Sequence, residues 1–147
     1  MPDVALNWQN KLEINIAPEA TEPIWVQIRK GFKNLAQAIN EVVYQASYLS
    51  DEGYSSSTVT GGQYIVTLTG DRQFGDEAQD YIFSDDVMFK WGTARETQLR
   101  ITRKNGTKIE WDVTLAKITD GGGDANTVSA VTVEIHGNGK PKITTTL

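Results

Sequence analysis

The sequence predicts a mainly β protein, a two-sheet β-sandwich with one flanking α-helix and a long hairpin loop. Short segments rich in Thr, Val and Ile recur along the chain, separated by clusters of Gly, Asn, Asp and Ser at the spacing typical of sandwiches and barrels. One segment alone, residues 75–90, has apolar residues near helical spacing. The length of 147 residues suits one domain, and no repeat or linker divides it, so we assign residues 1–147 to a single domain.

Eight segments are expected to be strands. They are residues 11–16, 24–28, 38–48, 63–69, 98–103, 107–118, 127–136 and 142–146. Alternation is clearest in the later segments, where Ile109, Trp111 and Val113 share one face of a strand. Glu110 and Asp112 share the other face. The apolar face is therefore predicted to pack in the core, and the polar face to meet water or another molecule.

Residues 75–90 are predicted to form one surface helix. Ala78, Tyr81 and Ile82 lie near helical spacing, and Asp76 followed by Gln79 resembles a capping box. The acidic side chains at the start of the segment also suit the positive end of a helix dipole.

Two connections are longer than a hairpin needs. Residues 50–62, SDEGYSSSTVTGG, are polar and rich in Ser and Gly, which marks the segment as a functional or disordered loop. Residues 119–126, TDGGGDAN, are expected to form a second loop tip.

The turn in RITRKNGTKIEW gives a specific strand register. A two-residue turn would place Ile101 opposite Glu110 and mix the two faces. A three-residue turn with Gly106 in the left-handed conformation keeps the apolar residues together. The expected pairs are Ile101 with Ile109, Leu99 with Trp111 and Arg100 with Glu110. Arg100 is therefore expected to neutralise Glu110 in part, leaving Asp112 as the freer charge.

The composition excludes several classes of protein. The chain has no cysteine and a single histidine, His136, which removes disulfide frameworks, thiolate zinc sites and two-histidine metal motifs. The formal net charge of −5 argues against tight binding of phosphates, which needs clustered Lys and Arg. No segment has the pattern of a signal peptide or the apolar length of a membrane span. We expect no membrane contact.

No catalytic or cofactor-binding motif is present. The G-x-S-x-G, Walker and H-E-x-x-H patterns are all absent. Residues 137–140, GNGK, faintly resemble a phosphate loop, but Pro141 follows where a helix should open, so a turn between the last two strands is expected. Asp120, Asp124 and Asn126 fit no calcium-loop spacing. The sequence therefore predicts no enzyme, no cofactor and no metal site.

The order of elements resembles that of the major tail tube proteins of long-tailed, siphovirus-like bacteriophages. The resemblance is carried by NEVVYQASYLSDEGYSSSTVTGGQYIVTLTGDRQFGDEAQDYIF and by the hairpin RITRKNGTKIEWDVTLAKI. In this order a two-faced strand leads into a long polar loop, a returning strand, a helix with a Gly-Asp start and a second hairpin. The similarity extends from about Trp25 to the end of the chain.

The resemblance implies a tail-tube-like β-sandwich whose copies form hexameric rings, and rings that stack into a hollow tube. Such a tube encloses a tape measure protein, meets tail terminator and tail-tip proteins at its ends, and conducts double-stranded DNA without binding it specifically. It also implies assembly in the host cytoplasm and a final place in the virion tail. Carried over to this chain, the hairpins of residues 38–69 and 98–118 would join neighbouring copies around the lumen.

The same resemblance implies two sets of site residues. The lumen-facing residues would be Glu41, Glu110 and Asp112. The loop that reaches the adjacent ring would contain Ser50, Asp51, Glu52, Tyr54, Thr58 and Thr60.

Two other classes remain open, as does the kind of particle. A carbohydrate-binding β-sandwich would use exposed tryptophans as a platform and stay monomeric, whereas a head-decoration or other virion protein would trimerise or bind capsids. The four tryptophans are Trp8, Trp25, Trp91 and Trp111. The sequence also does not separate a phage tail from a bacteriocin or a gene transfer particle.

Overall fold

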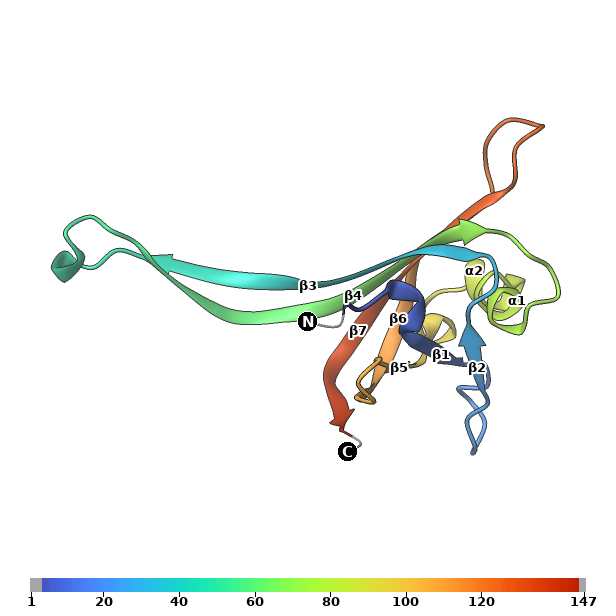
Figure 1. The fold of residues 1–147 in the computed structure, drawn as a ribbon, viewed down its shortest axis with the longest axis horizontal. Helices are drawn as coiled ribbons and strands as arrows, with labels where there is room; N and C mark the ends of the chain where they lie inside the picture. The colour runs from blue at the N-terminus through green and yellow to red at the C-terminus, as the bar shows by residue number, and fades with distance from the viewer. Residues whose placement is uncertain (1–3, 146–147) are drawn as a thin grey trace.

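The computed structural model of the protein describes residues 4–145, and its strands form one antiparallel sheet. The strands are β1 (Lys11–Asn15), β2 (Trp25–Ile28), β3 (Phe32–Ala46), β4 (Ser56–Asp71), β5 (Glu96–Thr102), β6 (Lys108–Asp120) and β7 (Ala130–Thr144). Their order in the sheet is β2-β1-β5-β6-β7-β4-β3 (Figure 1). The mainly β prediction is confirmed, but the strands make one continuous sheet instead of two separate ones. The reason is that β1, β5, β6, β7 and β4 each pair on both sides, so the ladder never breaks.

One face of this sheet is the core. The buried sheet residues are Leu12, Ile14, Ile28, Val66, Leu68, Leu99, Ile101, Ile109, Trp111, Val113, Leu115, Val131, Val133 and Ile135. The helical segment after β4 covers this face with Ala78, Ile82, Phe83 and Val87. The sheet curves, so that Leu12 and Ile28 at one end line the same groove as Phe32 and Leu35 at the other. The predicted separation into an apolar and a polar face is therefore present.

The helical segment consists of two short helices instead of the single one expected. They are α1 (Glu77–Ile82) and α2 (Asp85–Met88). The Asp76 carboxylate accepts a hydrogen bond from the Gln79 backbone N–H at 3.2 Å, which confirms the expected start. Ser84 divides the segment, because its hydroxyl donates to the Tyr81 carbonyl oxygen at 2.8 Å and competes with the helical pattern.

The remaining helical turns are short 3-10 segments. They are η1 (Asn7–Gln9), η2 (Leu49–Asp51) and η3 (Gly92–Arg95). None of the helices within residues 4–145 has the length and apolar character that crossing a bilayer requires.

The β5–β6 hairpin has the predicted register. Ile101 pairs with Ile109, Leu99 with Trp111 and Arg100 with Glu110. Gly106 has a φ of 91°, in the left-handed region that the three-residue turn requires. The pattern of alternating side chains was sufficient here because only one register buries the whole apolar set.

The expected turn at residues 137–140 is wrong. These residues lie inside β7, which runs on to Thr144, and the predicted last residue of that segment, Thr146, lies outside the described residues. The extra residues are taken up by a bulge, since Glu110 pairs with Lys142 but Asp112 pairs with Asn138. Gly139 supplies the left-handed conformation with a φ of 79°.

The largest departure from the sequence prediction is the hairpin of β3 and β4. Residues 56–62 were expected to be loop but are strand, and β3 begins at Phe32 instead of residue 38. The β-branched run from Thr58 to Thr60 favours a strand. Its pairing with β3 continues across a bulge, where the register shifts between Val42 and Val43. Figure 1 shows the resulting ribbon extending far from the body. We call residues 39–64, beyond the pairing of β4 with β7, the arm.

Candidate assembly surfaces

The arm is a two-stranded ribbon that carries exposed apolar side chains. They are Ile39, Val42, Val43, Tyr44, Tyr48, Leu49, Tyr54 and Val59, and each exposes about half of its surface or more. β3 is an edge strand of the sheet, and the arm portion of β4 pairs with β3 alone. An isolated two-stranded ribbon is marginally stable in water, and a large exposed apolar surface marks a contact site. The arm therefore has the properties of an interface that lacks its partner.

The arm ends in a compact tip, residues 47–55. The Asp51 carboxylate accepts a hydrogen bond from the Tyr48 backbone N–H at 3.0 Å, and the Ser47 hydroxyl donates to the Tyr54 carbonyl oxygen at 3.0 Å. Glu52 has a left-handed φ of 55°. The chain thus closes on itself through its own hydrogen bonds.

The residues predicted for the ring-stacking loop separate into two groups. The tip holds Ser50, Asp51, Glu52 and Tyr54, whereas Thr58 and Thr60 lie in β4. Tyr54 exposes 79% of its surface, so an aromatic ring and acidic side chains stand at the far end of the arm.

The polar face of the sheet carries two of the three predicted lumen residues. Glu110 and Asp112 alternate with the buried Trp111, so both lie on the face opposite the core, with Glu110 half-buried and Asp112 exposed. Gln98 donates a hydrogen bond to Asp112 at 3.2 Å. Glu41 is in phase with Leu35 on β3, and Leu35 pairs with the buried Leu68. The register therefore places Glu41 on the same face as the core residues, opposite to the polar face that carries Glu110 and Asp112.

Arg100 forms the expected ion pair with Glu110 only at its distance limit and binds another carboxylate more closely. It lies opposite Glu110 in the register, but its Nη1 is 4.0 Å from the Glu110 Oε1. Its Nε and Nη2 instead donate to the two carboxylate oxygens of Glu13 at 3.2 and 2.9 Å. Sequence reasoning missed this pair because the residues are far apart in the chain and β1 had not been placed beside β5.

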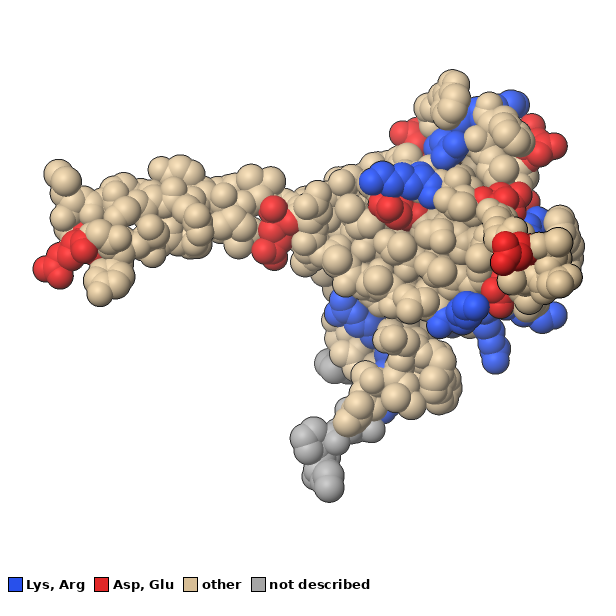
Figure 2. Space-filling view, turned by 90° about the horizontal axis from the view of Figure 1, so that it is seen from above, with Lys and Arg blue, Asp and Glu red and all other residues tan. Residues whose placement is uncertain are grey.

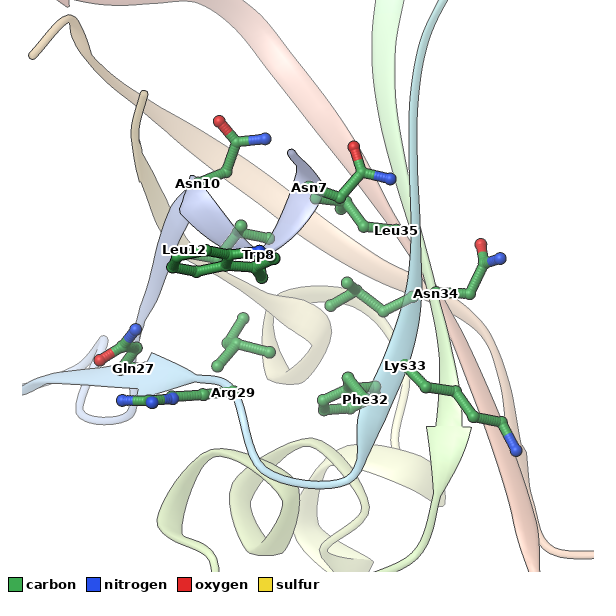
Figure 3. A pocket seen from close by; sticks show the side chains of 12 residues that line it. Asn7, Trp8, Asn10, Leu12, Gln27, Arg29, Phe32, Lys33, Asn34 and Leu35 are labelled. Atoms are coloured by element: carbon green, nitrogen blue, oxygen red, sulfur yellow. The ribbon is translucent and has the colours of Figure 1, made fainter. Parts of the chain in front are cut away.

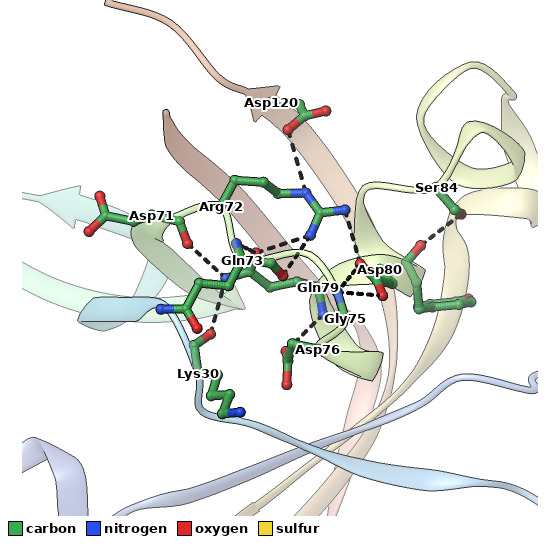
Figure 4. A network of polar contacts seen from close by, with 11 residues as sticks. Lys30, Asp71, Arg72, Gln73, Gly75, Asp76, Gln79, Asp80, Ser84 and Asp120 are labelled. Atoms are coloured by element: carbon green, nitrogen blue, oxygen red, sulfur yellow. Dashed lines mark hydrogen bonds and ion pairs between the residues drawn. The ribbon is translucent and has the colours of Figure 1, made fainter. Parts of the chain in front are cut away.

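A polar network joins the body end of the β3–β4 hairpin, where β3 begins and β4 ends, to the helices (Figure 4). The Gln79 side chain is completely buried, and its amide nitrogen donates to the carbonyl oxygens of Lys30 and Asp71 at 3.0 and 2.9 Å. Its amide oxygen accepts from the Gln73 backbone N–H at 2.8 Å and from Arg72 at 3.3 Å. Arg72 also forms an ion pair with Asp80 at 3.1 Å. The sequence marked Gln79 as part of a capping box with Asp76, but no motif indicated that its side chain joins the helices to β3 and β4.

A groove of about 400 Å³ opens between the two ends of the curved sheet. Its apolar lining includes Trp8, Leu12 and Phe32 (Figure 3). Trp8 exposes 78% of its surface, an unusual degree for tryptophan. Lys33 stands at the rim and points outward (Figure 3).

The charges of the arm are of one sign. No Lys or Arg occurs between Lys33 and Arg72, and the charged residues in that stretch are Glu41, Asp51, Glu52 and Asp71. Figure 2 shows acidic side chains at the end of the arm and at one place near the body, with mixed charges on the body itself. The arm is thus an acidic and apolar projection.

The described residues offer no metal centre. Within residues 4–145, no group of three or more His, Asp or Glu side chains is placed to hold an ion. His136 lies on the polar face, where its Nε2 is 3.0 Å from a Glu134 oxygen. These contacts are those of an ordinary surface histidine.

The fold was compared with solved structures. It superimposes on a chain in the tail of an empty gene transfer agent (GTA) particle with C6 symmetry, with a TM-score of 0.70 at 14% identity, covering 96% of this chain and 99% of that one. It has the fold of a tail tube protein. No protein-family model matches the sequence, and no curated protein is similar to it.

Contractile particles contain the same tail-tube fold. A chain of the anti-feeding prophage cap, which terminates its tube, superimposes with a TM-score of 0.61 at 11% identity over 99% of this chain and 94% of that one. A chain of the sheath-tube complex of an extracellular contractile injection system gives 0.50 at 13% identity, over 97% and 93%. The resemblance to long-tailed phages therefore holds at the level of the tube fold and not for the siphovirus class.

Proposed function

We propose that this protein is the structural subunit of a tail tube, in which copies associate into rings and rings stack into a hollow conduit. The observation that carries the proposal is the arm, whose apolar side chains have no partner within their own chain. The open edge of β3 supports it as well, because pairing between copies would remove an edge that otherwise invites aggregation. The C6 symmetry of the GTA tail, which shares the fold, supports six copies per ring.

The polar face of the sheet would line the lumen, with Glu110 and Asp112 facing the passing molecule. Acidic side chains suit a conduit for double-stranded DNA, since clustered basic residues would hold the phosphates and stop sliding. Glu41 is left out of this surface because the register places it on the other face. The tube would lie in a virion tail and contact a tape measure protein inside, with terminator and tail-tip proteins at its ends.

The experiment is electron microscopy and light scattering of the concentrated protein, beside a variant with a shortened arm. Replacing residues 43–60 with Asn-Gly leaves Val42 opposite Gly61, so the remaining strands keep their register. We expect rings or tubes from the natural chain and a folded monomer from the variant. The same thermal unfolding temperature within a few degrees would show that the variant has lost only its contacts.

One outcome would contradict the role of the arm, and another would contradict the tube function itself. Tubes formed equally well without the arm would remove the arm from the interface. The carbohydrate-binding class would be favoured if the natural chain stayed monomeric at millimolar concentration and glycans quenched its tryptophan fluorescence.

A further inference from the structure

We propose that the groove lined by Trp8, Leu12, Arg29, Phe32 and Lys33 receives the arm tip of an adjacent copy. This inference rests on the proposed tube function and specifies the acceptor of the arm. A groove of about 400 Å³ could take several side chains of the tip. The chemistry of the two surfaces identifies the occupant as a second copy of this chain.

The groove and the tip have opposite charges. Of the residues that line the groove, the charged ones are Arg29 and Lys33. Lys33 pairs with Asp71 at 3.2 Å, whereas Arg29 has no carboxylate within ion-pair distance among residues 4–145. The charged residues of the tip are Asp51 and Glu52. Contact between the two surfaces would therefore give Arg29 an acidic partner.

The apolar parts of the two surfaces match as well. The tip presents Leu49, which is fully exposed, and Tyr54, which exposes 79% of its surface. The groove is lined by the exposed indole of Trp8 and by the buried Leu12. Aromatic residues packed in a pocket within a ring of polar contacts are typical of the centre of a protein interface.

The tip is already ordered before contact. Asp51 and Tyr48 are joined by a side-chain hydrogen bond at 3.0 Å and by the Asp51 N–H bond to the Tyr48 carbonyl oxygen at 2.9 Å. A preformed tip loses little conformational entropy when it docks.

The tip cannot occupy the groove of its own chain. The arm leaves the body as an extended ribbon and its tip lies at the far end (Figure 1), whereas the groove lies near the base of β3. The contact must therefore join two copies, and it joins unlike surfaces. Such a head-to-tail contact repeats from copy to copy, which is the arrangement that builds closed rings or continuous stacks.

Disulfide cross-linking tests the contact directly, because the chain contains no cysteine. One variant carries Leu49→Cys at the tip, a second carries Asn34→Cys at the groove, and a control carries Asp124→Cys on an exposed loop. Under mild oxidation, we expect the mixture of the first two to give at least about tenfold more linked dimer than the mixture of the first with the control, owing to the high effective concentration of a docked tip.

A charge exchange tests the specificity of the same contact. Arg29→Glu or Glu52→Lys alone should raise the concentration needed for assembly about tenfold, and the two together should restore it to within about threefold of the natural value. Both residues are exposed, so neither change should prevent folding. If assembly recovers in the double variant, Arg29 and Glu52 contact each other directly, because a general effect of charge would not be reversed by the second change.

The outcomes separate this inference from the tube proposal. Tubes that form normally, with cross-linking at the groove no greater than at the control and no recovery in the charge exchange, would overturn the groove assignment and leave the tube function standing. A chain that forms no assemblies at all would overturn both.

Discussion

Arg100 and Glu13 form a two-pronged ion pair across the β1–β5 ladder, at 2.9 and 3.2 Å. Both side chains are less than a fifth exposed, at 19% and 13%, and the Arg100 guanidinium lies 4.3 Å from the centre of the Trp25 ring. A two-pronged pair with a planar guanidinium is stronger than an exposed ion pair, because its geometry is fixed and water screens it less. This contact joins the short β1–β2 end of the sheet to its centre.

Removing the Glu13 carboxylate should therefore destabilise the fold more than removing that of Glu110. We expect Glu13→Gln to lower the free energy of unfolding by about 1–2 kcal/mol. Glu110→Gln, the matched control in which the pair is 4.0 Å apart, should cost less than about 0.5 kcal/mol. Urea unfolding of both variants measures the difference. Equal losses would contradict the assignment of Glu13 as the main partner of Arg100.

Gln79 should be the most sensitive polar residue of the helical segment. Its buried amide donates hydrogen bonds to the carbonyl oxygens of Lys30 and Asp71 at the body end of the β3–β4 hairpin, so Gln79→Leu would leave those oxygens without donors. We expect a loss of about 2–4 kcal/mol in the free energy of unfolding. The control is Gln45→Leu on the exposed arm, which should change stability by less than about 0.5 kcal/mol. A small effect at Gln79 would show that water or a rearranged chain replaces the network.

The sequence determined the local pairings better than the overall form. Ile101 and Ile109 could be paired because alternation and one turn residue leave a single register that buries both. The long arm could not be predicted, because residues 56–62 look like a polar loop, and the pairing that makes them a strand depends on distant residues of β3. Gly occurs at bulges as readily as at turns. For this reason the segment around Gly139 was predicted to be a turn, although it is a bulge within β7.

The candidate surfaces likewise differ in whether short sequence patterns could predict them. The polar face with Glu110 and Asp112 followed from alternation alone. The groove around Trp8 depends on the curvature that brings the two ends of the sheet together, and no short pattern in the sequence reports that curvature. The face of Glu41 could not be predicted from alternation, because Val42 and Val43 are both apolar, and only the register shows that Glu41 lies on the opposite face from Glu110 and Asp112.

Alkaline pH should destabilise the protein through two half-buried tyrosines. Burial raises the pKa of Tyr64 and Tyr81 above the ordinary value of 10.0, and the Tyr64 hydroxyl is hydrogen-bonded to Gln37. The unfolded chain then loses these protons at a lower pH than the folded chain does. The stabilisation is therefore complete below pH 10 and is lost as the pH rises through the higher folded-state pKa values.

The measurement is urea unfolding between pH 8 and about pH 11, where the double variant Tyr64→Phe and Tyr81→Phe should show a shallower decline than the natural chain. Tyr54→Phe on the exposed arm is the control and should leave the decline unchanged. An identical alkaline decline in the double variant would assign the effect to other groups.

Charge reversal on the polar face should slow the passage of DNA without preventing tube formation. Asp112 is exposed and Glu110 half-buried, and neither makes a close ion pair, so Glu110→Lys with Asp112→Lys should leave the fold intact. In the proposed tube, each ring would then present basic side chains to the phosphates. We expect assembled particles to eject DNA more slowly, with a defect that weakens at high salt because phosphate attraction is screened.

The control for this last prediction places the same charge change elsewhere. Asp86→Lys with Asp124→Lys alters two exposed residues, on α2 and on the loop before β7, that lie off the polar face. This variant has the same net charge as the first, so normal ejection from it would assign the defect to position and not to total charge. Normal ejection from tubes carrying the Glu110 and Asp112 changes would remove these residues from the lumen while leaving the tube itself in place. A defect of equal size in both variants would point instead to a general effect of charge on assembly.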